Sequence, residues 1–176
     1  MRIDEKIVTL EGNVEICAWP KGLIEEYLKI EPSLQTAIAM AKKNSLPCHV
    51  QKMHNLTTNV GRQFVARRLS GQETVGITYM AFGSGATAPA IGDTTLETEV
   101  VRKPVTECYQ GDQYVYTSVF LLANECSFHL KEGAIFGGAS ASGVSNSGIM
   151  LCRFAMDEDN TLTSYDLTVQ HTGEMK

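Results

Sequence analysis

The sequence predicts a mainly β protein, an antiparallel β-sandwich of the jelly-roll or Ig-like kind, preceded by two or three short helices and an extended N-terminal arm. Helical spacing of apolar residues occurs only between residues 22 and 69. From Thr74 onward, short β-rich runs alternate with Gly, Asn, Asp and Ser turns. The 176 residues suffice for one domain with a small appended segment. We therefore expect the arm and a helical segment over residues 1–50, and the sandwich with a leading helix over residues 51–176.

The first 50 residues contain the arm and two of the helices. Residues 4–18 alternate in places between apolar and polar side chains, which indicates a strand or a short hairpin around Gly12. Helical spacing predicts helices over residues 22–30 and 33–44. Ser33 is expected at the N-cap of the second helix, because serine commonly accepts a hydrogen bond from a free amide of the first turn.

The leading helix of the sandwich domain is predicted from Thr57 or Thr58 to Leu69, and Gly71 is expected to end it. Turn residues at 111–112 and 157–160 mark hairpins between later strands. Strands of such a fold are half-buried, which explains the modest hydrophobicity of this region. The strands that we expect cover residues 76–82, 97–108, 113–122, 127–136, 148–156 and 161–171.

Charge and hydropathy argue against two classes of partner. The formal net charge is −5 at pH 7, and phosphate contacts need clustered Lys and Arg, so we expect no nucleic-acid partner. No apolar run approaches the roughly 20 residues that cross a bilayer, so we expect no membrane association. The N-terminus lacks the apolar core of a secretory signal, which indicates folding in a cytoplasm.

The sequence offers no catalytic constellation. Residues 83–88 (GSGATA) are similar to a dinucleotide-binding loop, but Pro89 and a β-rich continuation follow where that loop needs a helix. Residues 138–143 (GASASG) have the wrong spacing for a nucleophile elbow. We therefore expect no catalytic residues, no cofactor and no enzymatic activity.

A metal site is not expected either. Cys126 and His129 are three residues apart, so on a strand their side chains point to opposite faces. Cys48 and His49 with His54 contain ligand atoms, but a structural zinc site needs two ligand pairs at recognisable spacing. The five cysteines are widely spaced and odd in number, which favours reduced and mostly buried thiols.

Charged residues cluster at the predicted strand over residues 97–108. On such a strand Glu97 and Glu99 share one face while Arg102 lies on the other, so they do not form an acid–base pair for catalysis. Together with Asp93 at the strand entry, they are better suited to salt bridges, either solvated or between subunits.

Several short segments carry a resemblance to a known family. Residues 93–102 (DTTLETEVVR) follow the pattern D-T-x-L-x-x-E-V-x-R, and residues 148–153 (GIMLCR) match G-x-x-L-x-R. Residues 131–136 (KEGAIF) resemble an E-x-G-x-F strand, with Ile135 in place of the usual Leu. With the helix at 59–69 before them, these segments resemble, in order, a tail-fibre, collar or decoration-type domain of tailed bacteriophages. The resemblance spans roughly residues 55–170.

This resemblance implies a non-enzymatic virion structural protein that assembles in many symmetric copies. The chain has no fibre-shaft repeat, so an accessory component fits better: a capsid decoration (cement) protein, or a neck, collar or tail-fibre adaptor. The implied partners are other virion proteins, namely major capsid, portal, neck or tail proteins, and further copies of the chain in a homo-oligomer. The implied location is the virion, assembled in the bacterial host cytoplasm.

The sequence also suggests where subunits would meet. The alternating N-terminal arm lies outside the predicted sandwich, and we expect it to add a strand to a neighbouring subunit. The candidate interface residues are Asp93, Glu97, Glu99 and Arg102 in the charged segment, and Ile7, Val8, Leu10 and Val14 in the arm.

An alternative function remains open at this point. The same sandwich could serve as a receptor- or glycan-binding module of the tail, using exposed aromatic side chains. The candidates for this role are Trp19, Tyr109, Tyr114 and Tyr116.

Overall fold

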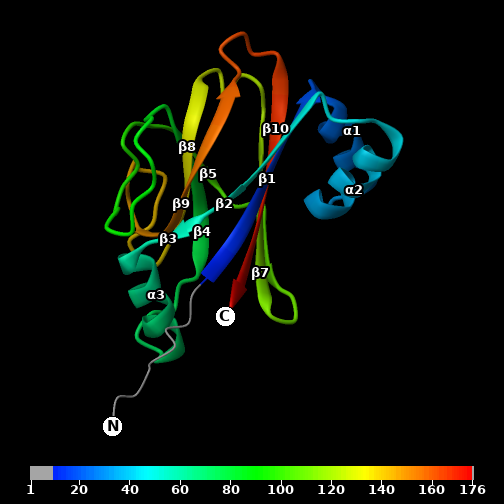
Figure 1. Cartoon of the computed structure of the whole chain (residues 1–176). Helices are drawn as coiled ribbons and strands as arrows, with labels where there is room; N and C mark the ends of the chain where they lie inside the picture. Colours follow the sequence, from blue (N-terminus) through cyan, green and yellow to red (C-terminus); the bar gives the residue numbers. More distant parts are fainter. Residues whose placement is uncertain (1–9, 176) are drawn as a thin grey trace.

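The predicted β-sandwich is confirmed: the chain forms two antiparallel sheets of five strands each (Figure 1). The computed structural model describes residues 10–175. Sheet A contains, in spatial order, β2 (His49–His54), β1 (Leu10–Pro20), β10 (Tyr165–Met175), β7 (Tyr114–Leu121) and β6 (Glu107–Gln110). Sheet B contains, in spatial order, β3 (Leu56–Thr57), β9 (Ile149–Asp159), β8 (His129–Gly137), β4 (Ile77–Gly83) and β5 (Glu99–Pro104).

The three predicted helices are also present, as α1 (Leu23–Ile30), α2 (Leu34–Asn44) and α3 (Asn59–Leu69). Helices α2 and α3 begin at capped termini, as expected for Ser and Thr at these positions. Ser33 accepts a hydrogen bond from the Thr36 amide at 3.4 Å, and Thr58 accepts one from the Gly61 amide at 2.9 Å.

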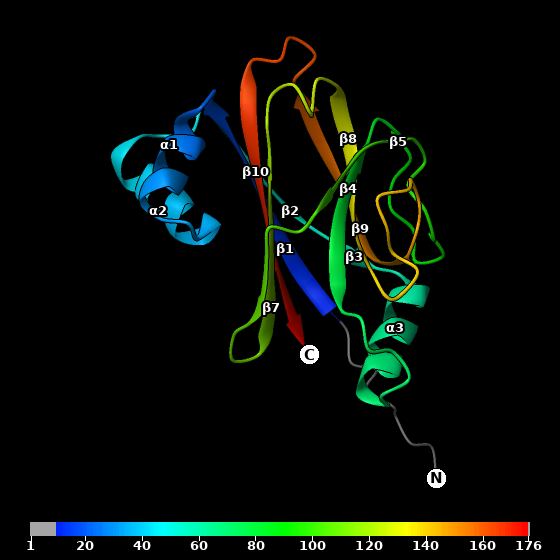
Figure 2. The same cartoon turned by 180° about the vertical axis from the view of Figure 1, so that it is seen from behind.

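Alternation along β1 explains why the sandwich carries helices on one side. Val14, Ile16 and Ala18 point between the sheets into the main core. Cys17 and Trp19 point the other way and form a second apolar cluster with buried residues of α1 and α2. The helix pair therefore covers part of the outer face of sheet A, as both views show (Figures 1 and 2).

The chain crosses between the sheets on both sides of the sandwich. On one side β2 leads through Asn55 into β3; the Asn55 amide bonds to the Gly12 carbonyl of sheet A at 3.0 Å, and Leu56 already pairs with Arg153 of sheet B. On the other side the link from β5 to β6 makes the change at residues 105–106. These crossings leave little unpaired edge along the sandwich.

The N-terminal arm is a correction to the prediction. Strand β1 runs unbroken through Gly12 and pairs with β10 over its whole length and with β2 over residues 13–18. It is therefore an inner strand of sheet A, with neither edge free to add to another subunit, and residues 10–20 belong to the sandwich. Alternation alone could not show this, because the partner strand β10 lies at the other end of the sequence. Ile7 and Val8 lie outside the described residues.

Candidate functional site

The loop over residues 84–98 crosses the outer face of sheet B and is held there by one buried carboxylate. Glu132 of β8 accepts hydrogen bonds from the amides of Thr98 at 2.8 Å, Glu97 at 3.1 Å and Gly85 at 3.2 Å. An array of backbone amides of this kind can bind a phosphate. In this chain the loop's amides already bind the protein's own Glu132.

Two glycines allow the carboxylate to approach the loop. A Cβ added to Gly83 would lie 2.4 Å from Oε1 of Glu132, and one added to Gly85 would lie 2.5 Å from the same atom. Both distances are too short for real Cβ atoms. The glycines that resemble a nucleotide-binding loop are therefore needed for close packing of the loop on Glu132.

Arg153 of β9 extends this network to the start of the loop. Its guanidinium donates to Glu132 at 3.1 Å, to Asp93 at 2.6 Å and to the Thr87 carbonyl at 2.9 Å. Burial acts to raise the pKa of Asp93, but the Ala90 amide and Arg153 outweigh it and hold the pKa below its usual value. Asp93 is therefore charged at neutral pH and clamps the loop to sheet B.

Glu99 and Arg102 form a second, neighbouring ion pair within the chain. The Glu99 oxygens accept from Nε and Nη2 of Arg102 at 2.7 and 2.9 Å, and the two side chains are only 2% and 3% exposed. The guanidinium also lies 4.2 Å from the centre of the Phe136 ring, a cation–π contact.

The predicted placement of these two residues on opposite faces is wrong. Phe82 pairs with Val101, but the next residue, Gly83, pairs with Glu99, so β5 contains a bulge. The extra residue shifts the alternation and brings both side chains to one face. Because they pair with each other and are buried, they are not available for the solvated or inter-subunit salt bridges that we expected.

The remaining candidate interface residues are also placed differently. Val14 is buried in the main core and cannot contact a partner. Glu97 is exposed, and its carboxylate accepts from the Thr87 amide at 2.9 Å. Leu10 is the first residue of β1. Of the charged candidates, Glu97 is the one that still faces solvent.

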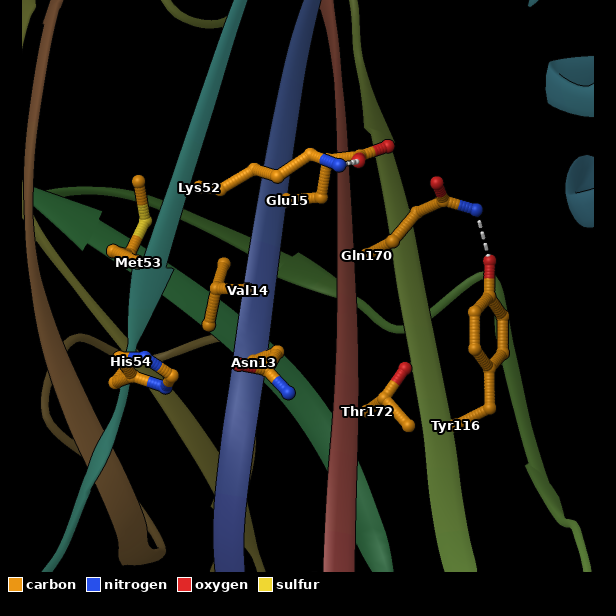
Figure 3. A pocket seen from close by; sticks show the side chains of 9 residues that line it. All are labelled: Asn13, Val14, Glu15, Lys52, Met53, His54, Tyr116, Gln170 and Thr172. Atoms are coloured by element: carbon orange, nitrogen blue, oxygen red, sulfur yellow. Dashed lines mark hydrogen bonds and ion pairs between the residues drawn. The ribbon is translucent and has the colours of Figure 1, made fainter.

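The outer face of sheet A has a different character, because polar side chains occupy a part of it that lies away from the helix pair (Figure 3). The strand registers place four polar side chains in one row across four strands, in the order His54, Asn13, Thr172 and Tyr116. The next row contains Lys52, Glu15 and Gln170. These residues, with two neighbours, line a hollow of about 410 Å³. We call this surface the open face.

Charges on the open face are compensated internally. Glu15 lies 3.0 Å from Lys52 and also pairs with Lys42 of α2. Burial acts to raise the pKa of Glu15, but the two ammonium groups outweigh it and lower that pKa. Glu15 is therefore a charged, paired group at neutral pH rather than a candidate proton acceptor.

The other row of the open face places an amide and two hydroxyl groups beside His54. Tyr116 accepts a hydrogen bond from Gln170 and lies against Tyr109, with ring centres 4.8 Å apart. Burial raises the pKa of Tyr116 to about 12, so its hydroxyl is neutral. Apart from the backbone pairing of their strands, Asn13 and Thr172 form no side-chain hydrogen bond with another described residue, so the exposed Asn13 and the half-buried Thr172 can bind a partner.

The aromatic candidates divide between surface and core. Tyr109 and Tyr114 are exposed beside the open face, and Tyr116 is mostly covered by its neighbours. Trp19 is fully buried under α1 and α2, where its indole donates to Thr168 at 2.9 Å. The prediction that Trp19 could contact a ligand is therefore wrong.

The cysteine and histidine candidates are dispersed. Cys126 is buried, while His129 lies at the surface, 2.5 Å from Asp157. Cys48 and His49 line the same surface hollow as His129, but His54 lies on the open face. All cysteines fall in the described part of the chain and have free thiols, three of them buried. Within residues 10–175 no three His, Cys, Asp or Glu side chains are arranged to hold a metal ion.

No protein-family model, curated protein or solved structure matches this chain. Among the described residues, no helix has the length and apolar character needed to span a membrane.

Proposed function

We propose that the chain is a non-enzymatic structural component of a tailed-bacteriophage virion. It would act as an accessory part, such as a capsid decoration protein or a neck, collar or tail-fibre adaptor, and stabilise the particle through contacts with other virion proteins and with further copies of itself. Support for this proposal comes from the ordered segments that resemble such domains, and from the role that their residues have in the fold.

The observation that carries the proposal is that these scattered segments meet in one place. Asp93 and the Glu99–Arg102 pair come from the segment over residues 93–102, Glu132 from residues 131–136 and Arg153 from residues 148–153. All are charged groups that bind loops to the outer face of sheet B. The patterns therefore describe a scaffold with closed loops rather than a reaction centre, which agrees with a structural role.

The open face is the surface that we assign to partner contacts. It is broad, shallow and polar, and its ionic groups are already paired. Virion parts meet over extended surfaces of this kind, because standard interfaces bury on the order of 800 Å² from each partner. An enclosed cleft with convergent titratable groups, as an enzyme requires, is not what this surface offers.

Purified particles from a phage that encodes this chain provide the test. Quantitative mass spectrometry should detect the chain in particles that have been freed of host proteins by gradient centrifugation. Copies on the order of hundreds would assign it to the head surface or a repeating tail part, and about ten to a neck, collar or adaptor ring. Absence of the chain from such particles would contradict the proposal.

A second candidate function is a receptor- or glycan-binding module. The uncharged row of Asn13, Thr172 and Tyr116, flanked by the exposed ring of Tyr109, favours it, because amides, hydroxyls and aromatic faces are suited to a neutral polyhydroxy ligand. A glycan array with the isolated protein separates the two functions. Signals that disappear in the Asn13→Ala/Thr172→Ala double variant would support glycan binding, and an empty array would leave the purely structural role.

A further inference from the structure

His171 is a buried histidine whose ring nitrogens both lack a hydrogen-bond partner. It lies on the inward face of β10, with 3% of its surface exposed. Both side-chain amide atoms of Asn55, at the crossing from sheet A to sheet B, are buried, and neither makes a hydrogen bond of normal geometry within the described chain. Buried polar groups nearly always find a partner, so this cluster indicates a place where a polar group binds.

The two side chains converge beside the backbone of Gly12. A Cβ added to this glycine would lie 2.1 Å from Oδ1 of Asn55 and 2.5 Å from Nε2 of His171. Any other residue at this position of β1 would push the polar groups away. The glycine therefore keeps the site open from the side of sheet A.

A small cavity adjoins these groups inside the sandwich. Its volume of about 20 Å³ has room for one group the size of a water molecule. Cys152 lies in its wall, close enough to Asn55 that the carboxamide acts to lower the pKa of the thiol, but a thiol is a weak hydrogen-bonding group and does not satisfy both amide atoms of Asn55. The rest of the wall is apolar, formed by Ile77, Val115, Ile135 and Leu151.

Three of these wall residues, Ile77, Val115 and Leu151, also line a much larger groove. This groove has a volume of about 680 Å³ and lies between α3 and the hairpin that joins β6 to β7. Its other walls include the apolar side chains of Phe64 and Leu69, the latter 71% exposed, and two charged side chains, Arg68 and Asp112. A mainly apolar groove at the surface thus shares a wall with a polar site inside the sandwich.

We propose that the groove and the cavity together bind a slender aliphatic molecule that ends in a small uncharged hydrogen-bonding group, such as a primary alcohol. The chain of the ligand would lie along the groove, and its hydroxyl would enter the cavity between His171 and Asn55. A hydroxyl both donates and accepts, which suits a neutral imidazole and a carboxamide. This site is independent of the proposed virion role.

The charge of the cavity selects the head group. Burial lowers the pKa of His171 to about 4, so the ring is neutral at physiological pH. Burial also raises the pKa of Cys152, the other titratable group in the wall, to about 12, so it stays a thiol. A carboxylate or ammonium head would meet no opposite charge there and would lose its hydration.

The test uses the full-length protein with 1-octanol as the probe, and octanoate as a ligand of equal chain length with a charged head. With labelled histidine, octanol should shift the ring signals of His171 saturably and leave those of the exposed His54 unchanged. Octanol should also raise the unfolding temperature, because a ligand that binds the folded state stabilises it. Octanoate should do neither at equal concentration.

Variants at the groove rim give a control that does not depend on repacking the core. Leu69→Asp, at an exposed position of the groove, should weaken octanol binding at least about tenfold, because it places a charge in the apolar channel. Leu162→Asp, at a position that is 84% exposed and outside the groove, should bind octanol normally.

Three results would overturn the proposal. The first is the absence of any saturable change at His171 with octanol. The second is equal binding of octanol and octanoate, since the cavity then does not discriminate between an uncharged and a charged head group. The third is a change at His171 on removing residues 1–9 while octanol has no effect, which would assign the groove to the chain's own N-terminal segment.

Discussion

The two outer faces of this sandwich are covered in different ways. Loops over residues 84–98 and 138–148 lie on sheet B, tied down by Glu132, Arg153 and the Glu99–Arg102 pair. Sheet A carries a helix pair on one half and exposes a polar surface on the other. We call the outer face of sheet B with these two loops the closed face. The charged residues of the recognisable sequence patterns hold the closed face together, whereas the open face has no such pattern.

The largest expected effect follows from removing the charge at the centre of the closed face. Glu132→Gln would leave the buried guanidinium of Arg153 with Asp93 as its one remaining carboxylate partner among the described residues, and we expect a loss of about 3–5 kcal/mol in unfolding free energy. Urea denaturation measures this change, with Glu25→Gln on the exposed side of α1 as the control, expected within about 0.5 kcal/mol. A loss below about 1 kcal/mol for Glu132→Gln would show that the closed face does not depend on this network.

A buried histidine between the two sheets makes the stability of the fold depend on pH. Burial lowers the pKa of His171 from 6.5 to about 4, so between these values the unfolded chain binds a proton that the folded chain excludes. The stability that comes from keeping His171 neutral is fully present above pH 6.5. It is lost as the pH falls toward 4, and the unfolding free energy then drops by about 3 kcal/mol in total.

The midpoints of urea denaturation, measured at about pH 7, 5.5 and 4, test this pH dependence. His171→Gln should lose less stability than the wild type over this interval, and His54→Gln, at an exposed position, should follow the wild type. Parallel pH profiles for the wild type and His171→Gln would contradict the assignment.

A smaller effect is expected from adding one methyl group to the loop of the closed face. Gly85→Ala places a Cβ 2.5 Å from the Glu132 carboxylate and 2.5 Å from Cβ of Glu97, and should cost about 1–3 kcal/mol. Gly143→Ala, in the other loop, meets nothing within 4 Å and should leave the unfolding midpoint nearly unchanged. Equal effects of the two substitutions would show that the loop over residues 84–98 is not packed closely on Glu132.

The smallest effect on stability is expected on the open face. Asn13→Ala with Thr172→Ala removes an exposed amide and a half-buried hydroxyl, neither of which has a side-chain hydrogen bond in the described chain, and should change the unfolding free energy by less than about 0.5 kcal/mol. The same double variant should be incorporated poorly into particles. Full incorporation would assign partner contacts to another surface.

Much of the secondary structure followed from local sequence signals. All three helices lie within a residue or two of their predicted bounds. For α2 and α3 the reason is local, because Ser33, Thr58 and Gly71 mark helix ends by capping and turn preferences. The hairpin at Gly111 was also predictable from its turn residues. By contrast, β2 and β3 carry weak alternation and were missed, and the predicted strand over residues 97–108 is two strands in different sheets.

The arrangement of the site could not be predicted from such signals. Glu132, Arg153 and Asp93 are far apart in sequence and meet only after sheet B has formed. A single-residue bulge placed Glu99 and Arg102 on one face, and regular alternation cannot show a bulge. The open face arises because β1, β10 and β7 are neighbours, and that order depends on contacts between the two ends of the chain.

Hydroxyl-radical footprinting of the chain, free and within purified particles, tests the central contrast most directly. Tyr109, Tyr114 and His54 report on the open face and its surroundings, whereas Ile91 and Val144 are exposed on the loops of the closed face. We predict that the first group loses reactivity in the particle while the second remains as reactive as in the free protein. Protection of Ile91 and Val144 with full reactivity at the open face would contradict the account.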